Sequence, residues 1–418
     1  MKPWIKILIG LALGIIIGCL FGTSSVEVFG YSLKNIILVI SRRFGQAFID
    51  LLKMLVGIIV FSSLVVGMCH ISDPKKLGRI GIRTLLFYTG TTVIAIFFGL
   101  LLVFTFKPGA ALSLPIPSDY LSAEKSSSMV DFVFGIVPSN PFAAFVNGDV
   151  LQIIVFAIFF AFAINFSGEK GKPILRLLES VSETMYSLTH FIMKFAPYGV
   201  CALIISSVMS VGIDIVPKLF NFLLCNYIAC LLQIIFVFAL SLKYLAKLKV
   251  APFFKGMKGA IALAFTTSSS SATLPVSLDC ARNHLGISGD IAGFVLSLGS
   301  TINMNGAAIG QAISAIFIAQ AYGIEITIGK VVILTFVSLV SAIGAAGIPG
   351  TGIVMLSVVL NAMNLPVEGI ALIAGVDRLR EMVSAVVNIL GDAVAAVFIA
   401  KKEDQINEDM YHKVTWLE

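Results

Sequence analysis

Charged residues are scarce in this chain. They make up 12% of the 418 residues, whereas hydrophobic residues make up 58%. A soluble fold of this length could not cover so much apolar surface, so the composition excludes an ordinary water-soluble domain and predicts a polytopic membrane protein. The net charge of +6 indicates no nucleic-acid partner, because the basic residues fall where membrane topology explains them.

Residues for metal or nucleophilic chemistry are also sparse. The four histidines share no spacing with one another or with cysteine, and the six cysteines are scattered in or beside apolar segments. We interpret the cysteines as small buried hydrophobes and expect no metal catalysis. There is no G-x-S-x-G motif, and only His284 lies near the serines at 268–271. The sequence therefore predicts no enzyme, and an intramembrane serine protease has no general base.

Long apolar runs are what the chain has in abundance. Residues 4–22, 79–105 and 217–242 are each long enough to cross a bilayer as a helix. The first run follows Lys2 and Lys6, as a signal peptide would. It lacks a small-residue cleavage site and leads into another apolar segment, so we interpret it as a retained span.

Lysine and arginine set the predicted topology. Basic clusters follow each even number of crossings, whereas the alternate links are poor in them; the clusters lie at 2–6, 75–83, 170–176, 243–258 and 401–402. The positive-inside rule then places both termini in the cytoplasm.

Two apolar regions are interrupted by residues that break helices. The stretch "TTSSSSATLP" (266–275) separates pieces 259–266 and 274–281, each too short to span. Residues 334–360 repeat the design around a Gly/Pro tip. We predict two re-entrant hairpins, the first entering from the cytoplasm and the second from outside. Such inverted repeats are typical of a transporter with its binding site near the bilayer midplane.

The segment after the first hairpin contains Asn303 and Asn305 between Gly299 and Gly306. Glycines beside asparagines suggest local unwinding, which frees backbone carbonyls to bind a cation. Three hydroxyls in an earlier span belong to Tyr88, Thr91 and Thr92; taken alone they indicate hydrogen bonds back to their own helix.

The segment after the second hairpin carries Asp377, Glu381, Asn388 and Asp392 at spacings that place them on one helical face. An aspartate at membrane depth costs about 2.5–3.5 kcal/mol, so Asp392 needs a partner such as a metal cation or an amine. A hydrogen-bonded clamp between helices is the alternative, but it does not explain two acids and an amide opposite two hairpins.

Several motifs together resemble one family. They are "NPFAAFVNGDVLQIIVFAI", "MKFAPYGVCALI", "SSSSATLPV", "LGSTINMNGAA", "GIPGTGIVMLSVVL" and "VNILGDAVAAVFIAKKE". Over nearly its whole length the chain resembles the dicarboxylate/amino acid:cation symporters, which include archaeal aspartate transporters, human excitatory amino acid transporters and neutral amino acid exchangers. The resemblance implies an all-α homotrimer in the lipid of the cytoplasmic membrane, with eight transmembrane segments, two re-entrant hairpins and an elevator mechanism. No cofactor is implied beyond sodium as the coupling ion.

The same resemblance divides the chain into a scaffold and a moving transport domain. Residues 1–77 and 134–212 would supply the scaffold. Residues 78–107 and 217–402 would supply the transport domain, with hairpins at about 251–283 and 325–362. Residues 403–418 form a tail, which we expect to be a solvated end in the cytoplasm.

The resemblance also implies functional residues. Substrate contacts would come from Ser269, Ser270, Ser271, Ala307, Ile348, Gly350, Gly352, Glu381, Ser384, Ala385 and Asn388. One sodium site would comprise Gly299, Asn303, Asn388 and Asp392, and a second Thr301, Met304, Ala342, Ile343 and Ala345. A third would comprise Tyr88, Thr91, Thr92, Asn303 and Asn305.

Departures from the family pattern bear on the substrate. Ser384 stands where acidic amino acid transporters have an arginine, and Ser268 occupies the alternative arginine position. Ala307 and Ala385 replace threonines, while Glu381 keeps the acid that receives the amino group. A dry site without arginine holds a second carboxylate poorly. We therefore predict a sodium-coupled symporter of a small neutral amino acid.

Three questions stay open at this point. Arg380 would support an acidic amino acid or C4-dicarboxylate symporter, coupled to sodium or protons, if it reached inward. It lies about 100° from Glu381 around a helix, and we expect it to face the lipid interface or another helix. Asn305 replaces an aspartate of the third sodium site, which predicts two coupled sodium ions rather than three. A passive anion pore is the competing class.

Overall fold

The structure is a computed structural model. It describes residues 3–22, 27–28, 31–70, 74–110, 112, 114, 137–147, 150–212, 215–344 and 350–413. Nearly all of these residues are helical. The exception is a hairpin of two strands, β1 (Glu27–Val28) and β2 (Tyr31–Ser32), which pair antiparallel with Glu27 opposite Ser32.

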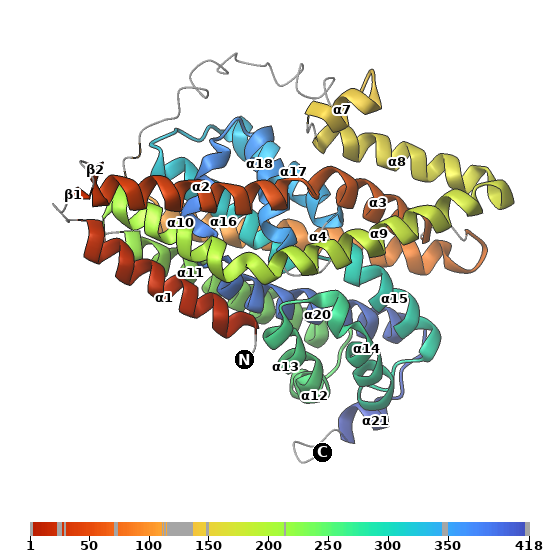
Figure 1. Ribbon diagram of the computed structural model, residues 1–418. Coiled ribbons are helices and arrows are strands. Elements are labelled where there is room, and N and C mark those ends of the chain that lie inside the picture. The colour runs from red at the N-terminus through yellow and green to blue at the C-terminus, as the bar shows by residue number, and fades with distance from the viewer. Residues whose placement is uncertain are drawn as a thin grey trace.

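Ten described helical elements belong to the first half of the chain (Figure 1). They are α1 (Pro3–Gly22), α2 (Leu33–Lys53), α3 (Val56–His70), α4 (Pro74–Phe106), α7 (Pro141–Asn147), α8 (Val150–Phe166), η1 (Gly168–Lys170), α9 (Lys172–Ile192), η2 (Met193–Phe195) and α10 (Ala196–Val211).

The second half begins with α11 (Ile215–Leu232), which continues into the π-helical segments η3 (Gln233–Ala239) and η4 (Ser241–Leu245). The remaining elements are α12 (Val250–Gly256), α13 (Lys258–Thr267), α14 (Ser270–Asp279), η5 (Cys280–His284), α15 (Gly289–Ile302), α16 (Asn305–Ala321), α17 (Ile328–Gly344), α18 (Thr351–Ala362), η6 (Val367–Gly369), α19 (Ile370–Ile373), α20 (Asp377–Lys402) and α21 (Glu408–Lys413).

Four helical stretches within the described residues are long and apolar enough to cross a membrane. They are Ile80–Phe106, Ile215–Leu245, Gly289–Ala321 and Asp377–Lys402. The last two are surrounded by protein over most of their length, so their polar residues face other helices rather than lipid. The full number of crossings stays a prediction.

Helix packing sorts the elements into two sets. In the first, α10 packs against α1 and α2, and α3 packs against α8 and α9. In the second, α4 packs against α11 and α16, and α20 packs against α13, α15 and α16. In Figure 1, α2 and α3 run across the molecule below α7 and α18, while α12, α13, α14 and α21 gather at the bottom of the view.

Three helix breaks occur where the sequence predicted them. Between α13 and α14, Ser268 adopts a left-handed backbone (φ 53°, ψ 37°) and Ser269 caps α14 through its side chain, which accepts from the Ala272 amide. Between α15 and α16, Asn303 and Met304 leave the helical conformation. The third break separates α17 from α18, where Gly350 has a φ of 91°. The paired short helices are therefore confirmed, although their re-entry into a membrane is not tested.

The described part of the tail is mostly exposed, as expected, but it is also anchored to the rest of the protein. Residues 403–413 fold back onto the loop after η5: the Asn407 amide donates to the Gly286 carbonyl, and the Ser288 amide donates to the Gln405 carbonyl. Tyr411 is fully buried, and its hydroxyl donates to the Lys249 carbonyl at 2.8 Å. Burial raises the pKa of the Tyr411 hydroxyl. The polar composition of the tail did not predict that this side chain is buried. Most described residues of the tail are exposed, as expected of a solvated end, and Tyr411 is the buried residue that anchors it.

Removing the Tyr411 hydroxyl tests whether the docked tail adds stability. We expect Tyr411→Phe to lower the free energy of unfolding by about 1 kcal/mol, because the hydrogen bond from Tyr411 to the Lys249 carbonyl is lost. Thermal unfolding in detergent measures the change. Tyr198→Phe is the matched control, since Tyr198 is 75% exposed; equal shifts in the two variants would contradict the contact.

Candidate functional site

One face of α20 carries the predicted polar residues. Asp377, Glu381, Asn388 and Asp392 are all 9% exposed or less. The spacing of four, seven and four residues brings them onto neighbouring turns. The structure therefore confirms that these four side chains share a buried face.

Asn388 lies where three other elements meet α20. Its Oδ1 accepts from the Gly306 amide at the start of α16, at 2.7 Å. Its Nδ2 lies 3.4 Å from Ser270 Oγ, at the start of α14, and 3.2 Å from Met304 Sδ. The N-termini of α14 and α16 thus reach the same side chain. Helix N-termini favour negative charge, so this corner suits a carboxylate.

Glu381 meets the N-terminus of α18. The Gly350 amide donates to both oxygens of the carboxylate, at 3.0 and 3.1 Å. Arg378 Nη1 lies 3.8 Å from Oε2. A buried carboxylate beside a hairpin tip is a receptor for a cation such as an ammonium group, which would compete with the Gly350 amide for it.

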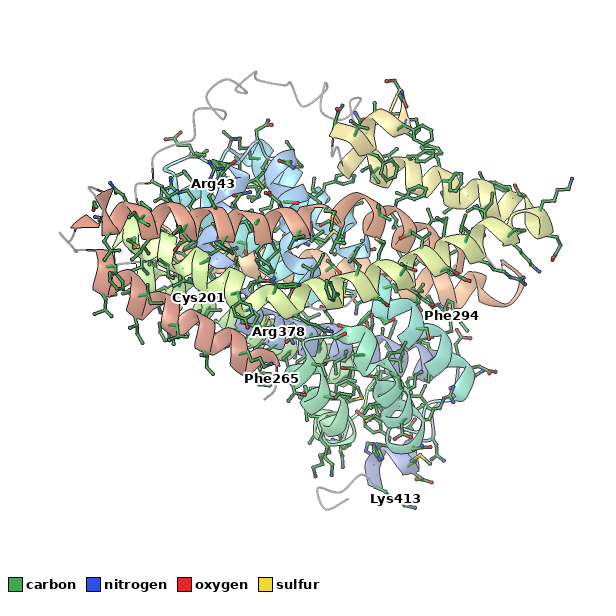
Figure 2. All side chains as sticks on the ribbon, viewed as in Figure 1. Arg43, Cys201, Phe265, Phe294, Arg378 and Lys413 are labelled. Atoms are coloured by element: carbon green, nitrogen blue, oxygen red, sulfur yellow. The ribbon has the colours of Figure 1, made fainter. Side chains whose placement is uncertain are left out.

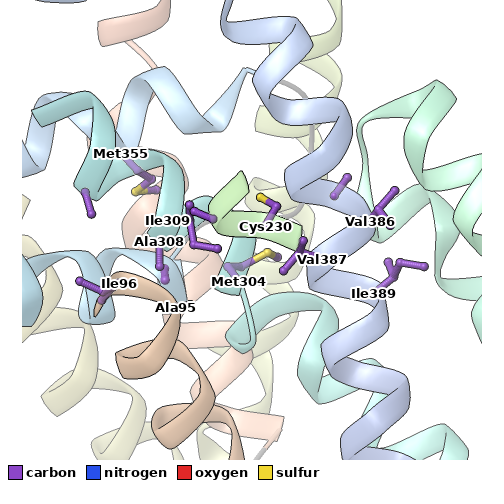
Figure 3. Close-up of a cluster of buried hydrophobic side chains, with 14 of the residues drawn as sticks. Ala95, Ile96, Cys230, Met304, Ala308, Ile309, Met355, Val386, Val387 and Ile389 are labelled. Carbon is purple, nitrogen blue, oxygen red and sulfur yellow. The ribbon is translucent and has the colours of Figure 1, made fainter. Parts of the chain in front are cut away.

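The side chains around this corner keep it small and dry. Ser269 and Ser270 are buried, as are Ala385 and Ser384, whose hydroxyl donates to the Arg380 carbonyl. Figure 3 shows apolar residues of α16 and α20, among them Met304, Ile309 and Val387, packed next to the break in the α15–α16 helix. Ala307 and Ser271 are half-buried.

A cation site fits around Asp392. The Asn303 amide nitrogen donates to Asp392 Oδ1 at 2.8 Å, while Asn303 Oδ1 is buried without a hydrogen-bond partner among the described residues. A Cβ at Gly299 would overlap the Asp392 carboxylate and lie 2.6 Å from the Tyr88 hydroxyl. Oxygen atoms from a carboxylate, an amide and a backbone are the ligands that hard cations prefer. These residues therefore fit the predicted sodium ion.

Filling the space at Gly299 is expected to disable this cation site. A methyl group there would collide with Asp392 and Tyr88, so we expect Gly299→Ala to lower sodium affinity by at least about tenfold. Sodium titration of substrate binding provides the measurement. Gly293→Ala on the same helix is the control, because its nearest neighbour is 3.6 Å away; a parallel loss in both variants would contradict the assignment.

In the third predicted cation site, the Asn305 side-chain amide is hydrogen-bonded to both threonines. Asn305 Oδ1 lies 2.6 Å from Thr92 Oγ1, and Asn305 Nδ2 donates to Thr91 Oγ1 at 3.2 Å. Both threonines also bond back to the Tyr88 carbonyl, as the spacing alone indicated. Tyr88 donates to the Val295 carbonyl. The amide nitrogen sits among oxygens that a cation would need, which agrees with a weakened site.

The second predicted cation set is only partly described. Thr301 Oγ1 donates to the Leu298 carbonyl, Met304 contacts Asn388, and Ala342 is buried near the end of α17. The side chain of Ile343, together with the whole of Ala345 and Ile348, lies outside the described residues. The predicted roles of these three residues stay predictions.

Arg380 takes the second of its two predicted placements. We expected it at the lipid interface or against another helix, and it is 3% exposed and packed against other helices. A Cβ at Gly310 of α16 would overlap its Nη1, and a Cβ at Gly352 of α18 would lie 2.5 Å from its Nη2. The lipid interface is excluded because the guanidinium lies between these helices, next to Glu381.

Two polar residues near the site were given no role in the sequence interpretation. Arg378, marked on α20 in Figure 2, was expected on a different face, but it donates to the Thr267 carbonyl at the end of α13. Its spacing of three residues from Glu381 was the signal for its contact with that carboxylate. Gln233 is buried at the start of η3 and donates to the Thr91 carbonyl; a lone glutamine in an apolar span was the signal.

Comparison with known proteins identifies the family. The model of the sodium:dicarboxylate symporter family matches residues 4–402. The chain belongs to the sodium:dicarboxylate symporter family. The resemblance inferred from the motifs is thereby confirmed, and the chain is a membrane transporter of this family rather than an enzyme.

Three relatives illustrate the range within the sodium:dicarboxylate symporter family. The proton/sodium-glutamate symport protein of Bacillus caldotenax is 37% identical over 97% of this chain and 95% of its own length. The proton/glutamate-aspartate symporter of Escherichia coli (strain K12) is 34% identical over 96% and 93%. The C4-dicarboxylate transport protein of Laribacter hongkongensis is 33% identical over 88% and 85%.

Proposed function

We propose that the protein is a cation-coupled symporter of a small α-amino acid in the cytoplasmic membrane. The observation that carries the proposal is Glu381, a buried carboxylate at the N-terminus of α18 on the same face as Asn388. Asn388 and the start of α14 would receive the α-carboxylate, and Glu381 would receive the amino group. The negative carboxylate of an amino acid would thus meet hydrogen-bond donors, and its positive ammonium group would meet a carboxylate.

A C4-dicarboxylate is the second candidate, since one relative bears that name. Glu381 disfavours it, because a dicarboxylate would bring a negative charge to a buried carboxylate without an ammonium group to offset it. The neutral amino acid predicted from Ser384 remains within the proposed function. An acidic amino acid was disfavoured because no arginine stands at residues 268 or 384. The buried guanidinium of Arg380 weakens that argument.

Helix packing supports the proposed division of labour. Residues 1–77 and 134–212 would form a scaffold, and residues 78–107 and 217–402 would form a transport domain that moves as an elevator within a homotrimer. In support, α4 packs with α11 and α16 in the second set of helices, although it lies in the first quarter of the chain. Sodium is the proposed coupling ion, with Asp392 and Asn303 among its ligands.

A competition panel tests the substrate class. Purified protein in sodium buffer would be challenged with serine, alanine, threonine, aspartate and succinate, each competing for a labelled ligand that binds. We expect an amino acid to compete best and succinate to compete weakly. If succinate were stronger than every amino acid, the role of Glu381 would be wrong.

Restoring a charge at residue 305 tests the ion count. Asn305→Asp would place a carboxylate beside the Thr91 and Thr92 hydroxyls, which should create a further sodium site. We expect the coupling ratio to rise from two sodium ions to three per substrate. Reversal potentials measured in proteoliposomes give this ratio, and an unchanged value would contradict the prediction.

A further inference from the structure

The described part of the tail crosses the base of the first hairpin. This hairpin consists of α13 and α14, and its base is formed by α12 on one side and by η5 with the loop 285–288 on the other. On the first side, α21 packs against α12 (Figure 1) and Tyr411 donates to the Lys249 carbonyl. On the second side, the Asn407 amide donates to the Gly286 carbonyl. One short segment therefore contacts both ends of the hairpin.

The contact with the loop after η5 is an antiparallel pairing. Ile287 faces Ile406 across the pair. Next to it, the Ser288 amide donates to the Gln405 carbonyl at 3.1 Å, and the two side chains share a further hydrogen bond of 2.7 Å. Ile287 is 3% exposed and belongs to the hydrophobic core. The tail is therefore paired with a buried part of the loop.

The backbone of the loop fits the tail closely. Gly286 has a left-handed φ of 67°, and a Cβ there would lie 2.6 Å from the Asn407 carbonyl oxygen. A side chain at this position would be strained and would push the tail away. At the other end of the segment, Glu403 pairs with Arg83 of α4 at 2.6 Å. The segment thus joins α4, α20 and the base of the hairpin.

A fixed base matters because the tip of the same hairpin borders the proposed site. Ser270, at the start of α14, lies 3.4 Å from Asn388 Nδ2 on α20. The arms α13 and α14 have 10 residues each, and helices this short depend on their contacts for stability. They pack against α20 directly. The tail continues from the end of α20 at Lys402, so its contacts fix the hairpin relative to α20 at a second place.

We propose that residues 403–413 act as a strap that holds the base of the first hairpin in register with α20 and thereby positions Ser270 at the substrate site. The effect on substrate binding rests on the proposed function, whereas the hold on the base does not. The helix α21 has only six residues, and Tyr411 is its fully buried side chain. Removing this side chain should release the strap while the rest of the protein stays folded.

Hydrogen exchange resolved to single amides tests the hold on the base. The Ser288 and Asn407 amides report docking of the strap, because their acceptors lie in the opposite segment. The Leu285 and Ile287 amides report the hairpin base itself, because they donate to carbonyls of η5. In Tyr411→Ala all four amides should exchange at least about tenfold faster. Faster exchange of Ser288 and Asn407 alone would overturn the proposal, since the tail would then be a passive appendage.

A cross-link separates release of the strap from a general folding defect. Ile287 and Ile406 face each other in a pair whose side chains lie close together, so cysteines at both positions can form a disulfide. In the Tyr411→Ala background, oxidation of Ile287→Cys with Ile406→Cys should restore slow exchange, and reduction should reverse it. Met410→Ala is the control, because Met410 is 40% exposed on the same helix; it should exchange like the wild type. Fast exchange that persists after cross-linking would contradict the strap.

Uptake into proteoliposomes tests the effect on the site, with the amino acid that competes best in the panel. Tyr411→Ala should raise its KM about three- to tenfold, and the oxidised cross-link should return the KM to the wild-type value. An unchanged KM in Tyr411→Ala, or a raised KM that the cross-link does not lower, would overturn the positioning of Ser270. Wild-type protein that transports no amino acid would overturn the proposed function and leave the exchange results to decide the hold on the base.

Discussion

Asp392→Asn is expected to abolish sodium-driven transport. Asp392 is buried, and its carboxylate faces Asn303, whose own oxygen has no hydrogen-bond partner in the part of the chain that the structure describes. Replacing the carboxylate with an amide removes the only formal negative charge described at this site. Loss of one partner from a buried charge pair costs about 3–5 kcal/mol, so sodium affinity should fall by at least 100-fold.

The measurement for this variant is uptake as a function of external sodium. Substrate affinity at saturating sodium, if it can be reached, should recover toward the wild-type value. Asp290→Asn on α15 is the control, because that aspartate is exposed. An unchanged sodium dependence in Asp392→Asn would contradict a cation site at this residue.

Glu381→Gln is expected to disable amino acid binding while sparing the cation site. Glutamine can still accept the Gly350 amide that the carboxylate now accepts, so the contact between α18 and α20 should survive. The negative charge that offsets the substrate ammonium is lost. The KM for amino acids should rise by about 100-fold or more, with a much smaller change in sodium affinity.

Equilibrium binding of amino acid and of sodium, measured separately, distinguishes this variant from Asp392→Asn. Glu368→Gln is the matched control, since Glu368 is exposed in η6. If Glu381→Gln weakened sodium binding as strongly as substrate binding, Glu381 would belong to the cation site and not to the amino-group receptor.

The polar face of α20 was predictable because it depends on local geometry. Spacings of four and seven residues place Asp377, Glu381, Asn388 and Asp392 on one side of any α-helix, and membrane depth makes each of them costly unless partnered. The helix breaks at Ser268 and at Asn303 were predictable for a related reason, since hydroxyl and amide side chains beside glycine or proline disfavour a continuous apolar helix.

The direction of Arg380 was not predictable in the same way. Its angle from Glu381 around the helix pointed away from the site, but a long side chain can turn back when its neighbours make room. That room comes from Gly310 and Gly352, which are 70 and 28 positions away in the sequence. The contact of Tyr411 with Lys249 was not predictable either, because these residues are also far apart in the sequence. Contacts between distant segments depend on packing, which periodicity does not encode.

Concentrative uptake tests coupled transport most directly. Proteoliposomes containing the purified protein would receive an inward sodium gradient and the labelled amino acid that competes best in the panel, with parallel samples lacking the gradient. We predict that the gradient drives this amino acid above its external concentration and that dissipating the gradient releases it. Its equilibration to equal concentrations, with or without the gradient, would contradict coupled transport and indicate a passive pore.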